Sequence, residues 1–335
     1  MQRDLCLPRP IYWAKHKLRY LHPAVPALMQ RFRSVECEAL VAQLCSQGFD
    51  LVWVESIVSM QMLPGSLRAR VIVDLPDLEH RSLRWQLRLW KIHHMTPLHW
   101  LEFLKLRRLE RTLHALPYEF AVCSEIDKKA LGADGHVWVI PNGTDLPPRT
   151  PAVLEDNRDP ILLFVGSMFY GPNVDAVRFF AQRVLPLIRH EIPDVKFLIV
   201  GRDPAPSVWQ LHDGKSVIVA GTVPEVIGYL RCAAAVVVPI RFGGGTRIKV
   251  LEAMAYRKPV VSTSVGAEGL DVQSGKHLLL ADSPGDFAEA CTLLLKDGSL
   301  RQRLSEEGFQ LVSDHYQWVM IERMVRDIVL GAAER

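Results

Sequence analysis

The stretch AAAVVVPIRFGGGTRIKVLEAMAY, residues 233–256, has the pattern of a buried strand, a glycine-rich turn and the start of a helix. An unbroken apolar run is typical of a parallel strand that is covered on both faces. Arg247 and Lys249 fall in the first helical turn, where unpaired N–H groups and the macrodipole favour negative charge. A bound diphosphate would stabilise both cations through charge-assisted hydrogen bonds. The alternative is a solvated helix start in which Lys249 forms an ion pair with Glu252.

Strand-like and helical patterns alternate on both sides of this stretch, and they predict an α/β fold. Between residues 161 and 281 the strand-like runs are continuous and β-branched, which indicates a parallel sheet in a doubly wound domain. Before residue 145 the same alternation of strand-like and helical patterns is less regular, with longer helical stretches between the strands. The predicted strands are 49–56, 69–75, 119–124 and 136–143 in the first part, and 161–166, 195–201, 216–221, 233–240, 259–263 and 277–281 in the second.

A stretch dense in Pro, Asn, Gly and Asp, residues 141–160, divides the chain. We expect residues 1–145 to form a Rossmann-like domain and 146–160 to form a linker. Residues 161–312 are expected to form a second Rossmann-like domain, and 313–335 a C-terminal helix that packs back towards the first domain.

The composition excludes several classes of protein. The chain has 335 residues, of which 49% are hydrophobic and 23% charged, and its net charge of +3 is that of a soluble globular protein rather than a nucleic-acid binder. Its six cysteines include no C-x-x-C pair, which favours reduced thiols, and we expect neither a metal nor a cofactor. No apolar run approaches the ~20 residues of a membrane span. We therefore expect a cytoplasmic protein, at most peripheral on the inner face of the membrane.

Two glycine-containing turns follow predicted strands, at the end of the sheet where doubly wound domains bind ligands. In VGSMFYGPN, residues 165–173, Gly166 ends the strand and Asn173 opens the next helix. In FGGGTR, residues 242–247, Thr246 is the predicted N-cap. Neither turn has the G-x-G-x-x-G spacing of a dinucleotide site or the spacing of a P-loop. This argues against a nicotinamide-dependent oxidoreductase.

Three stretches of the chain together resemble the family 4 glycosyltransferases of GT-B fold. They are LFVGSMFYGPNVDAVRFF, VIPNGTD and GGGTRIKVLEAMAYRKPVVSTSVGAEGLDVQSGKHLLLADSP. The resemblance covers residue 49 to the end, and it implies two Rossmann-like domains that face a cleft, the first for an acceptor and the second for a nucleotide-sugar donor. It also implies retaining, metal-independent transfer of a sugar from a nucleoside diphosphate to a glycan or lipid-linked acceptor, in cell-surface polysaccharide or glycoconjugate synthesis.

The resemblance also assigns roles to individual residues. Arg247 and Lys249 would contact the donor diphosphate, and Glu252 would bind the nucleotide ribose. The turn after the first strand of the second domain would face the donor phosphates, and Val223 would lie near the nucleobase. The predicted donor-binding residues are Gly166, Ser167, Asn173, Val223, Gly243, Gly244, Gly245, Thr246 and Glu252.

The sequence departs from this family in both turns and at its front. Gly244 stands where many relatives have a glutamate, and Ser167 stands where many have a basic residue. Residues 11–48 have a helical pattern, so we expect the first strand and glycine turn of the family's N-terminal domain to be missing. Either the chain is a fragment or late-start product, or the protein tolerates an incomplete sheet. The alternative function is a degenerate or truncated member that binds nucleotide sugar or a partner without turnover.

Polar residues follow the predicted strand at 69–75, in a position that resembles the family's loop near the transferred sugar. The predicted catalytic residues are Asp74, Arg247 and Lys249. Asp77, Glu79 and His80 are second choices for the sugar contact, and the alternative for the two acids is a cap on the next helix.

Residues 81–114 hold eight Lys or Arg against two Glu, with three interleaved Trp. Such a helical pair could contact an anionic membrane surface. The alternative, which we favour for most of the segment, is a pair of amphipathic helices that cover the sheet. In that case Leu101, Leu104 and Leu113 would be buried and the arginines solvated.

Overall fold

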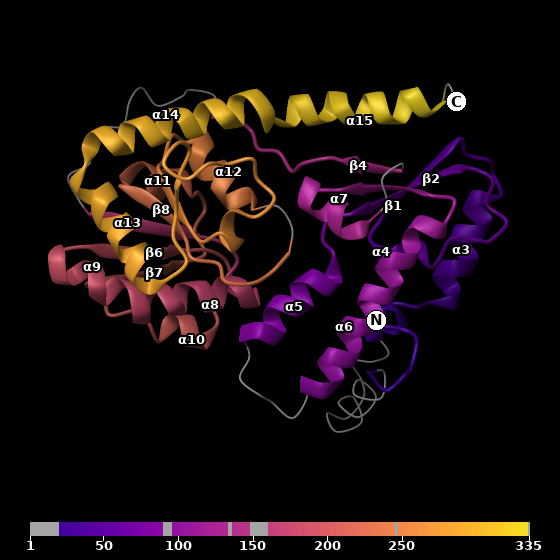
Figure 1. Cartoon of the computed structure of the whole chain (residues 1–335), viewed down its shortest axis with the longest axis horizontal. Helices are drawn as coiled ribbons and strands as arrows, with labels where there is room; N and C mark the ends of the chain where they lie inside the picture. The colour runs from indigo at the N-terminus through magenta and orange to yellow at the C-terminus, as the bar shows by residue number, and fades with distance from the viewer. Residues whose placement is uncertain (1–19, 90–95, 133–135, 148–159, 245–246, 334–335) are drawn as a thin grey trace. The chain divides into compact units, whose positions relative to one another are not determined.

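The computed structural model of the chain describes residues 20–89, 96–132, 136–147, 160–244 and 247–333 (Figure 1). The chain divides into two compact units, unit 1 with Met1–Ile140 and Arg326–Arg335, and unit 2 with Pro141–Val325. The predicted linker at 146–160 lies outside the described residues except for residues 146, 147 and 160.

Unit 2 contains a six-stranded sheet in which every pair of neighbouring strands is parallel. The chain first adds strands on one side of β5 and then crosses to its other side. The carboxyl ends of β5 and β8 therefore form a topological switch point, where ligands bind in doubly wound sheets. All six predicted strands are confirmed. In spatial order they are β10 (Leu279–Leu280), β9 (Val260–Ser262), β8 (Ala235–Val238), β5 (Ile161–Val165), β6 (Lys196–Val200) and β7 (Val217–Gly221).

Helices pack on this sheet in two groups. Right-handed crossovers that move in opposite directions along a sheet place their helices on opposite faces. One group joins α13 to α9 and to the π-helical turn Phe180–Val184, and the other joins α12 to α14. The helices are α8 (Gly171–Phe179), α9 (Leu185–Glu191), α10 (Pro206–Trp209), α11 (Ile227–Cys232), α12 (Ile248–Ala255), α13 (Pro284–Lys296), α14 (Gly298–His315) and α15 (Trp318–Ala333), the last of which ends in unit 1.

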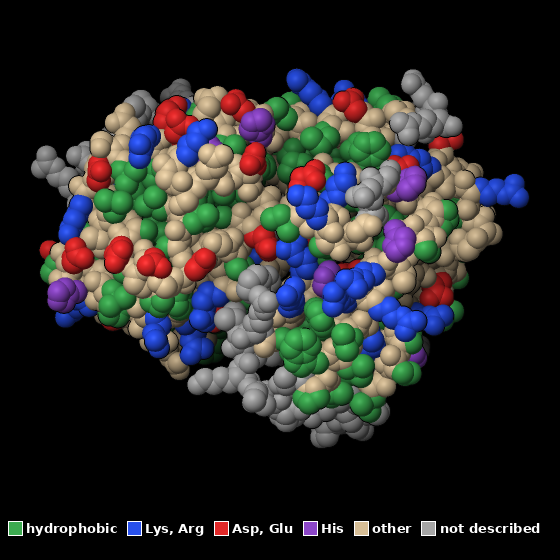
Figure 2. All heavy atoms as spheres, viewed as in Figure 1, with side chains coloured by type: hydrophobic (Ala, Val, Ile, Leu, Met, Phe, Trp, Pro, Cys, Tyr) green, Lys and Arg blue, Asp and Glu red, His purple; other side chains and the backbone are tan. Residues whose placement is uncertain are grey.

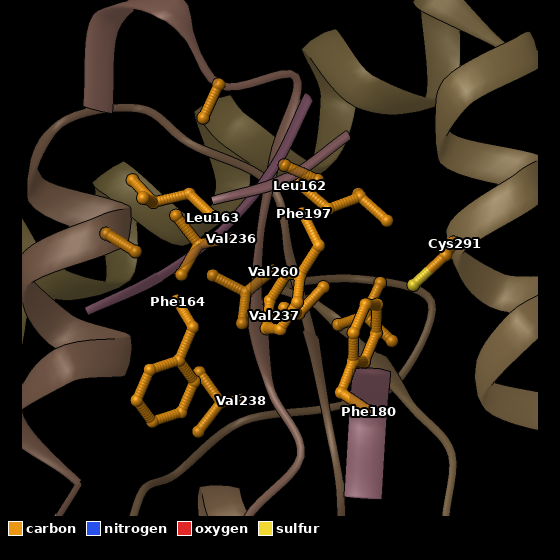
Figure 3. Close-up of a cluster of buried hydrophobic side chains, with 14 of the residues drawn as sticks. Leu162, Leu163, Phe164, Phe180, Phe197, Val236, Val237, Val238, Val260 and Cys291 are labelled. Carbon is orange, nitrogen blue, oxygen red and sulfur yellow. The ribbon is translucent and has the colours of Figure 1, made fainter. Parts of the chain in front are cut away.

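The core of unit 2 is built from the unbroken apolar strands that the sequence predicted. Phe164, Val237 and Val260 come from three neighbouring strands and are fully buried (Figure 3). Phe180 packs on Phe197 with ring centroids 4.4 Å apart. Because both faces of these strands are covered, their sequences lack polar alternation.

Unit 1 contains a four-stranded parallel sheet with its strands in chain order. Crossovers that all step in one direction lie on one face of the sheet. Buried residues of that face include Val73, Phe120, Leu113 and Leu131. The strands are β1 (Leu51–Glu55), β2 (Arg70–Leu75), β3 (Glu119–Val122) and β4 (Val137–Val139), and the helical segments are α2 (Ala27–Arg31), α3 (Val35–Cys45), α4 (Ile57–Met60), α5 (Glu79–Leu89), α6 (Thr96–Thr112), a 3-10 turn (Leu113–Ala115) and α7 (Glu125–Leu131).

The other face of this sheet has a smaller apolar cluster, formed by Ile72, Ala121 and Ile328 of α15. Arg70 donates to the Ile328 carbonyl at 3.3 Å. The fold class is thus confirmed as α/β with two parallel sheets. Within the described part of residues 1–50 the chain forms helices α2 and α3, and no strand precedes β1 there.

Candidate functional site

The switch point of unit 2 brings the two predicted glycine turns to one edge of the sheet. After β5, the Gly166 N–H donates to the Val200 carbonyl at 3.0 Å. A Cβ placed on Gly166 would lie 2.8 Å from Asn173 Nδ2 and 3.2 Å from Lys249 Nζ. Side chains from α8 and α12 thus meet directly above this backbone, and glycine leaves them the space.

Lys249 points from the first turn of α12 onto the turn after β5. Its Nζ donates to Asn173 Oδ1 at 2.6 Å and lies 4.6 Å from the centroid of the Phe164 ring. Asn173 is buried, and its Nδ2 donates to the Ser167 carbonyl at 2.9 Å. The amide of Asn173 therefore links Lys249 to the first glycine turn. No ion pair between Lys249 and Glu252 is present among the described residues, so the alternative that required one is wrong.

The electrostatic state of Lys249 follows from its surroundings. Burial, and to a smaller extent the neighbouring Arg247, lower the pKa of Lys249 to about 7, and Glu252 opposes this shift. Because desolvation disfavours the charged form, the ammonium is only partly populated near neutral pH. An anion bound beside Nζ would restore the charge.

Arg247 points inward, and its side chain contacts the glycine turn that precedes it. The residue is 8% exposed. Its Nη2 donates to the Gly243 carbonyl at 2.7 Å, its Nη1 to the Gly244 carbonyl at 2.6 Å, and its Nε to the Val265 carbonyl at 3.3 Å. The guanidinium therefore holds the turn in shape. A contact of Arg247 with a diphosphate stays a prediction.

The start of α12 differs from the sequence prediction by one residue. The helix begins at Ile248, and Arg247 occupies the N-cap position with φ −85° and ψ 76°, without a side-chain cap bond. The prediction that Thr246 is the N-cap is therefore wrong. The physical reason is that Arg247 leaves helical geometry while its side chain returns to the preceding carbonyls. Gly245 and Thr246 themselves lie outside the described residues.

A cavity of about 530 Å³ opens beside the first turns of α12, entirely within unit 2. Lys249 and Glu252 line it together with Trp318 and apolar residues of α11. Glu252 keeps an exposed surface, but desolvation of its carboxyl in the cavity wall raises the pKa, an effect that Lys249 opposes. The volume suits a small-molecule ligand. A ligand with an anionic group, hydroxyl groups and an apolar face would match this lining. The cavity residues are Gly143, Thr144, Asp145, Val165, Val226, Ile227, Leu230, Val236, Ile248, Lys249, Glu252, Ala253, Tyr256 and Trp318.

The sheet and both turns of unit 2 lie in a segment that a family model matches. The model is described as glycosyl transferases group 1, and the match covers residues 159–297. This segment is therefore similar to the group 1 glycosyltransferases. The match includes both turns of the candidate site and most of the cavity wall on α11 and α12.

Two known proteins are similar to parts of this chain. An uncharacterized 44.6 kDa protein in the cps region of Klebsiella pneumoniae is 26% identical over 163 residues, which are 46% of this chain and 42% of that protein. An uncharacterized glycosyltransferase of Methanocaldococcus jannaschii is 35% identical over 106 residues, 31% of this chain and 30% of that protein. The chain thus matches less than half of the length of either relative.

A solved structure shows that the fold extends over most of the chain. A TarM mutant from S. aureus, in complex with fondaparinux, alpha-GlcNAc-glycerol and UDP, superposes with a TM-score of 0.67 at 14% identity, covering 89% of this chain and 58% of the TarM chain. The chain has the GT-B glycosyltransferase fold.

Two other predicted donor residues of unit 2 are Val223, which follows the edge strand β7, and Gly243, which lies in the turn after β8. Val223 is half-buried and packs on the core, and it does not line the cavity, whereas Val226 and Ile227 do. Gly243 adopts φ +122°, where side chains are strained, and a Cβ there would lie 3.3 Å from Pro172 Cγ.

Of the fourteen residues that line the cavity, only Lys249 and Glu252 were predicted from the sequence as site residues. Thr144, Tyr256 and Trp318 are among those that were not. Thr144 follows β4 and forms a β-bridge with Gln317, which places Trp318 beside the cavity. A Cβ on Gly143 would lie 2.9 Å from the Trp318 ring, so glycine permits this approach. The motif VIPNGTD was the available signal for Thr144. Tyr256 ends α12 on the same side as Glu252, and helical spacing could have indicated it.

In unit 1, Asp74 lies at the carboxyl end of β2 as the sequence predicted. It is half-buried. Burial raises the pKa of Asp74, a hydrogen bond with the Trp53 side chain lowers it, and Glu55 raises it. Its assignment as a catalytic residue stays a prediction.

The second-choice residues of unit 1 form a cluster of titratable groups around the start of α5. Burial, with Asp77 and Glu110 nearby, raises the pKa of Glu79 to about 7. The buried carboxylate of Glu110 contacts His80 Nδ1. The acidic-cap alternative fits Glu79, which lies in the first turn of α5.

Two further properties concern only the part of the chain that the structure describes. In it, no group of three or more His, Cys, Asp or Glu is arranged to hold a metal ion. None of the helices in that part is long and apolar enough to cross a membrane. Metal independence of the reaction stays a prediction.

Proposed function

We propose that this chain transfers a sugar from a nucleoside-diphosphate donor to a glycan or lipid-linked acceptor, with retention of the anomeric configuration and without a metal. The observation that carries this proposal is the position of Lys249. Its half-buried Nζ joins two strand-to-helix turns at the switch point, beside a cavity of about 530 Å³. The family match of the surrounding domain and the TarM complex with UDP support a nucleotide ligand for this cavity.

Each residue of the site has a role in donor binding under this proposal. The diphosphate lies at the N-terminus of α12, where backbone N–H groups favour an anion. Lys249 supplies a positive charge to the phosphates, and Arg247 keeps the glycine turn open for them. Glu252 accepts hydrogen bonds from the ribose, and the nucleoside lies along the apolar wall that includes Trp318.

The reaction breaks the bond between the anomeric carbon and the phosphate oxygen of the donor. A bond forms between the same carbon and the acceptor oxygen, on the same face of the sugar. The acceptor proton passes to the leaving phosphate, which departs as the nucleoside diphosphate. The charge that develops on this leaving group is stabilised by Lys249 and by preorganised N–H groups. Asp74 is proposed to contact the transferred sugar.

The comparisons also support a biological setting. The Klebsiella pneumoniae relative belongs to a cps region, which favours a role in cell-surface polysaccharide synthesis. The donors of such reactions are cytoplasmic metabolites, so we place the protein in the cytoplasm. The TarM complex contains alpha-GlcNAc-glycerol, which supports a glycan-type acceptor for this chain.

Donor binding is tested by calorimetry of the full chain with UDP, GDP and ADP, comparing Lys249→Met with Lys276→Met. Lys276 is exposed and outside the site, so it serves as the matched control. A charge-assisted contact contributes about 1.5–3 kcal/mol, so Lys249→Met is expected to weaken binding by roughly 10- to 150-fold. The proposal fails if none of the three nucleotides binds, or if both variants bind them equally well.

Turnover is tested separately by incubating the chain with UDP-, GDP- and ADP-sugars and measuring release of the nucleoside diphosphate. Because helices occupy the described residues before β1, a member that binds donors without turnover is the second candidate. Nucleotide binding without any release, even with added glycan acceptors, would favour that candidate. Release that Lys249→Met abolishes would favour the transferase.

A further inference from the structure

The outward face of α6 in unit 1 carries exposed apolar and basic side chains together. Leu104, which the sequence analysis expected to be buried, is 55% exposed, and Trp100 is 48% exposed. Arg107, Arg108 and Arg111 follow on the same helix and are also exposed. Residues spaced by three, four, seven and eight positions share one face of a helix, so these five side chains form one stripe.

The charges of α6 are sorted between its two faces. Both acidic residues of the helix, Glu102 and Glu110, are buried, and so is Lys105. No ion pair engages the exposed arginines of the stripe among the described residues. The charged side chains that the structure describes on the outward face of α6 are therefore all basic.

A buried ion pair of α6 holds the segment 20–27 against this helix. Lys105 Nζ lies 2.7 Å from Glu102 Oε2 and donates to the carbonyls of Tyr20 and Val25, each at 3.3 Å. Glu102 Oε1 accepts from the Ala27 N–H at 2.5 Å. The segment 20–27 is thus fixed against the helix. Figure 2 shows hydrophobic side chains gathered where Figure 1 draws α6, with Lys and Arg side chains next to them. Leu21 and Val25 of that segment are also exposed.

We propose that the stripe on α6, formed by Trp100, Leu104, Arg107, Arg108 and Arg111, binds the anionic surface of a lipid bilayer. A bilayer offers hydrocarbon directly beside negatively charged headgroups, which matches an apolar zone directly beside a basic one. Trp and Arg are suited to this boundary because each combines an apolar body with a polar end. A second copy of the chain would bring arginines against arginines. A nucleic acid would leave the apolar zone in water.

The expected strength of binding is modest and depends on charge. Each basic side chain beside an anionic bilayer contributes roughly fivefold to the partition constant, and the attraction is screened by salt. Replacing three arginines is therefore expected to lower binding about 100-fold. Such binding is reversible and needs no membrane-spanning helix.

The test is co-sedimentation of the full chain, without any sugar nucleotide, with vesicles of phosphatidylcholine alone or with about a third phosphatidylglycerol. The charge variant changes all three stripe arginines to Gln, and the apolar variant combines Trp100→Ser with Leu104→Ser. The matched controls change the exposed unit 2 residues Arg178, Arg183 and Arg303 to Gln, or Trp209 and Leu187 (48% and 47% exposed) to Ser. Circular dichroism checks that each variant is folded.

We expect binding to the anionic vesicles only, lost in the charge variant and in the apolar variant and retained in both controls. If the apolar variant does not fold, the charge variant alone decides. The proposal is overturned if the unmodified chain does not bind anionic vesicles, or if the control variants lose as much binding as the stripe variants. It is also overturned if the stripe substitutions instead abolish self-association in size-exclusion chromatography. Because no nucleotide is present, any of these failures leaves donor binding by unit 2 untouched.

Discussion

The pKa of Lys249 predicts that nucleoside-diphosphate binding is coupled to proton uptake. In the free protein this pKa is about 7. A phosphate charge about 4 Å from Nζ stabilises the ammonium by ~4 kcal/mol at an effective dielectric constant of 20, or about 3 pKa units. The pKa of Lys249 in the complex should therefore return to about 10. The free protein must then take up a proton whenever it binds the nucleotide above neutral pH.

The size of the effect follows from the protonated fraction of Lys249. That fraction falls from about one half at pH 7 to about 0.01 at pH 9 for a pKa of about 7. Affinity for UDP, or for whichever nucleotide binds best, is thus expected to fall about 50-fold, or ~2.3 kcal/mol, between pH 7 and pH 9. At pH 8 about 0.9 proton should be taken up for each nucleotide bound.

Calorimetry in Tris and HEPES, which differ in ionisation enthalpy, measures both the affinity and the proton uptake. The control is Lys249→Met, which should bind more weakly and show no loss of affinity with pH over this range. Titration of the nucleotide itself is common to both proteins and cancels in the comparison. An affinity that is flat from pH 7 to 9 in the unmodified chain, or a slope that persists in Lys249→Met, would refute the reasoning.

Three further substitutions test the surroundings of this lysine. Arg247→Ala removes three hydrogen bonds to backbone carbonyls, so chemical denaturation should show a loss of about 2–4 kcal/mol; unchanged stability would mean that the guanidinium does not hold the turn. Gly166→Ala places a Cβ 2.8 Å from Asn173 Nδ2, so nucleotide affinity measured by calorimetry should fall at least tenfold, and full affinity would place the phosphates elsewhere. Glu252→Gln should weaken UDP more than a ribose-free diphosphate, because its proposed partner is the ribose; equal losses for both ligands would contradict that role.

The sequence was sufficient to predict the sheet of unit 2 and the edge at which its site lies. Strands such as 233–240 are unbroken apolar runs because both of their faces are covered. Such a strand can therefore be recognised in the sequence without knowing which strands lie beside it. Gly166 and Gly243 marked the two turns for a similar local reason, since close backbone approach at the first and positive φ at the second need glycine. Lys249 was placed correctly at the start of α12 by helical spacing.

The directions of side chains were decided by tertiary structure. Arg247 and Lys249 look alike in the sequence, but the path of the glycine turn brings carbonyls to Arg247, while α8 brings Asn173 to Lys249. The sequence pattern does not predict these hydrogen-bond partners, because they depend on how the glycine turn folds back and on which helix lies next to α12. The depressed pKa of Lys249 arises only from that packing.

The stripe on α6 also separates what the sequence predicted from what tertiary contacts decided. Periodicity predicted an amphipathic helix, but it could not say whether Leu104 or Glu102 would face the core. The segment 20–27 decided this, because its backbone groups pair with Glu102 and Lys105 and draw both charges inward. Leu104 and the arginines were left outside. The sequence by itself determined which elements form and where glycine turns meet them; tertiary structure determined which charges are buried, because burial depends on contacts between residues far apart in the chain.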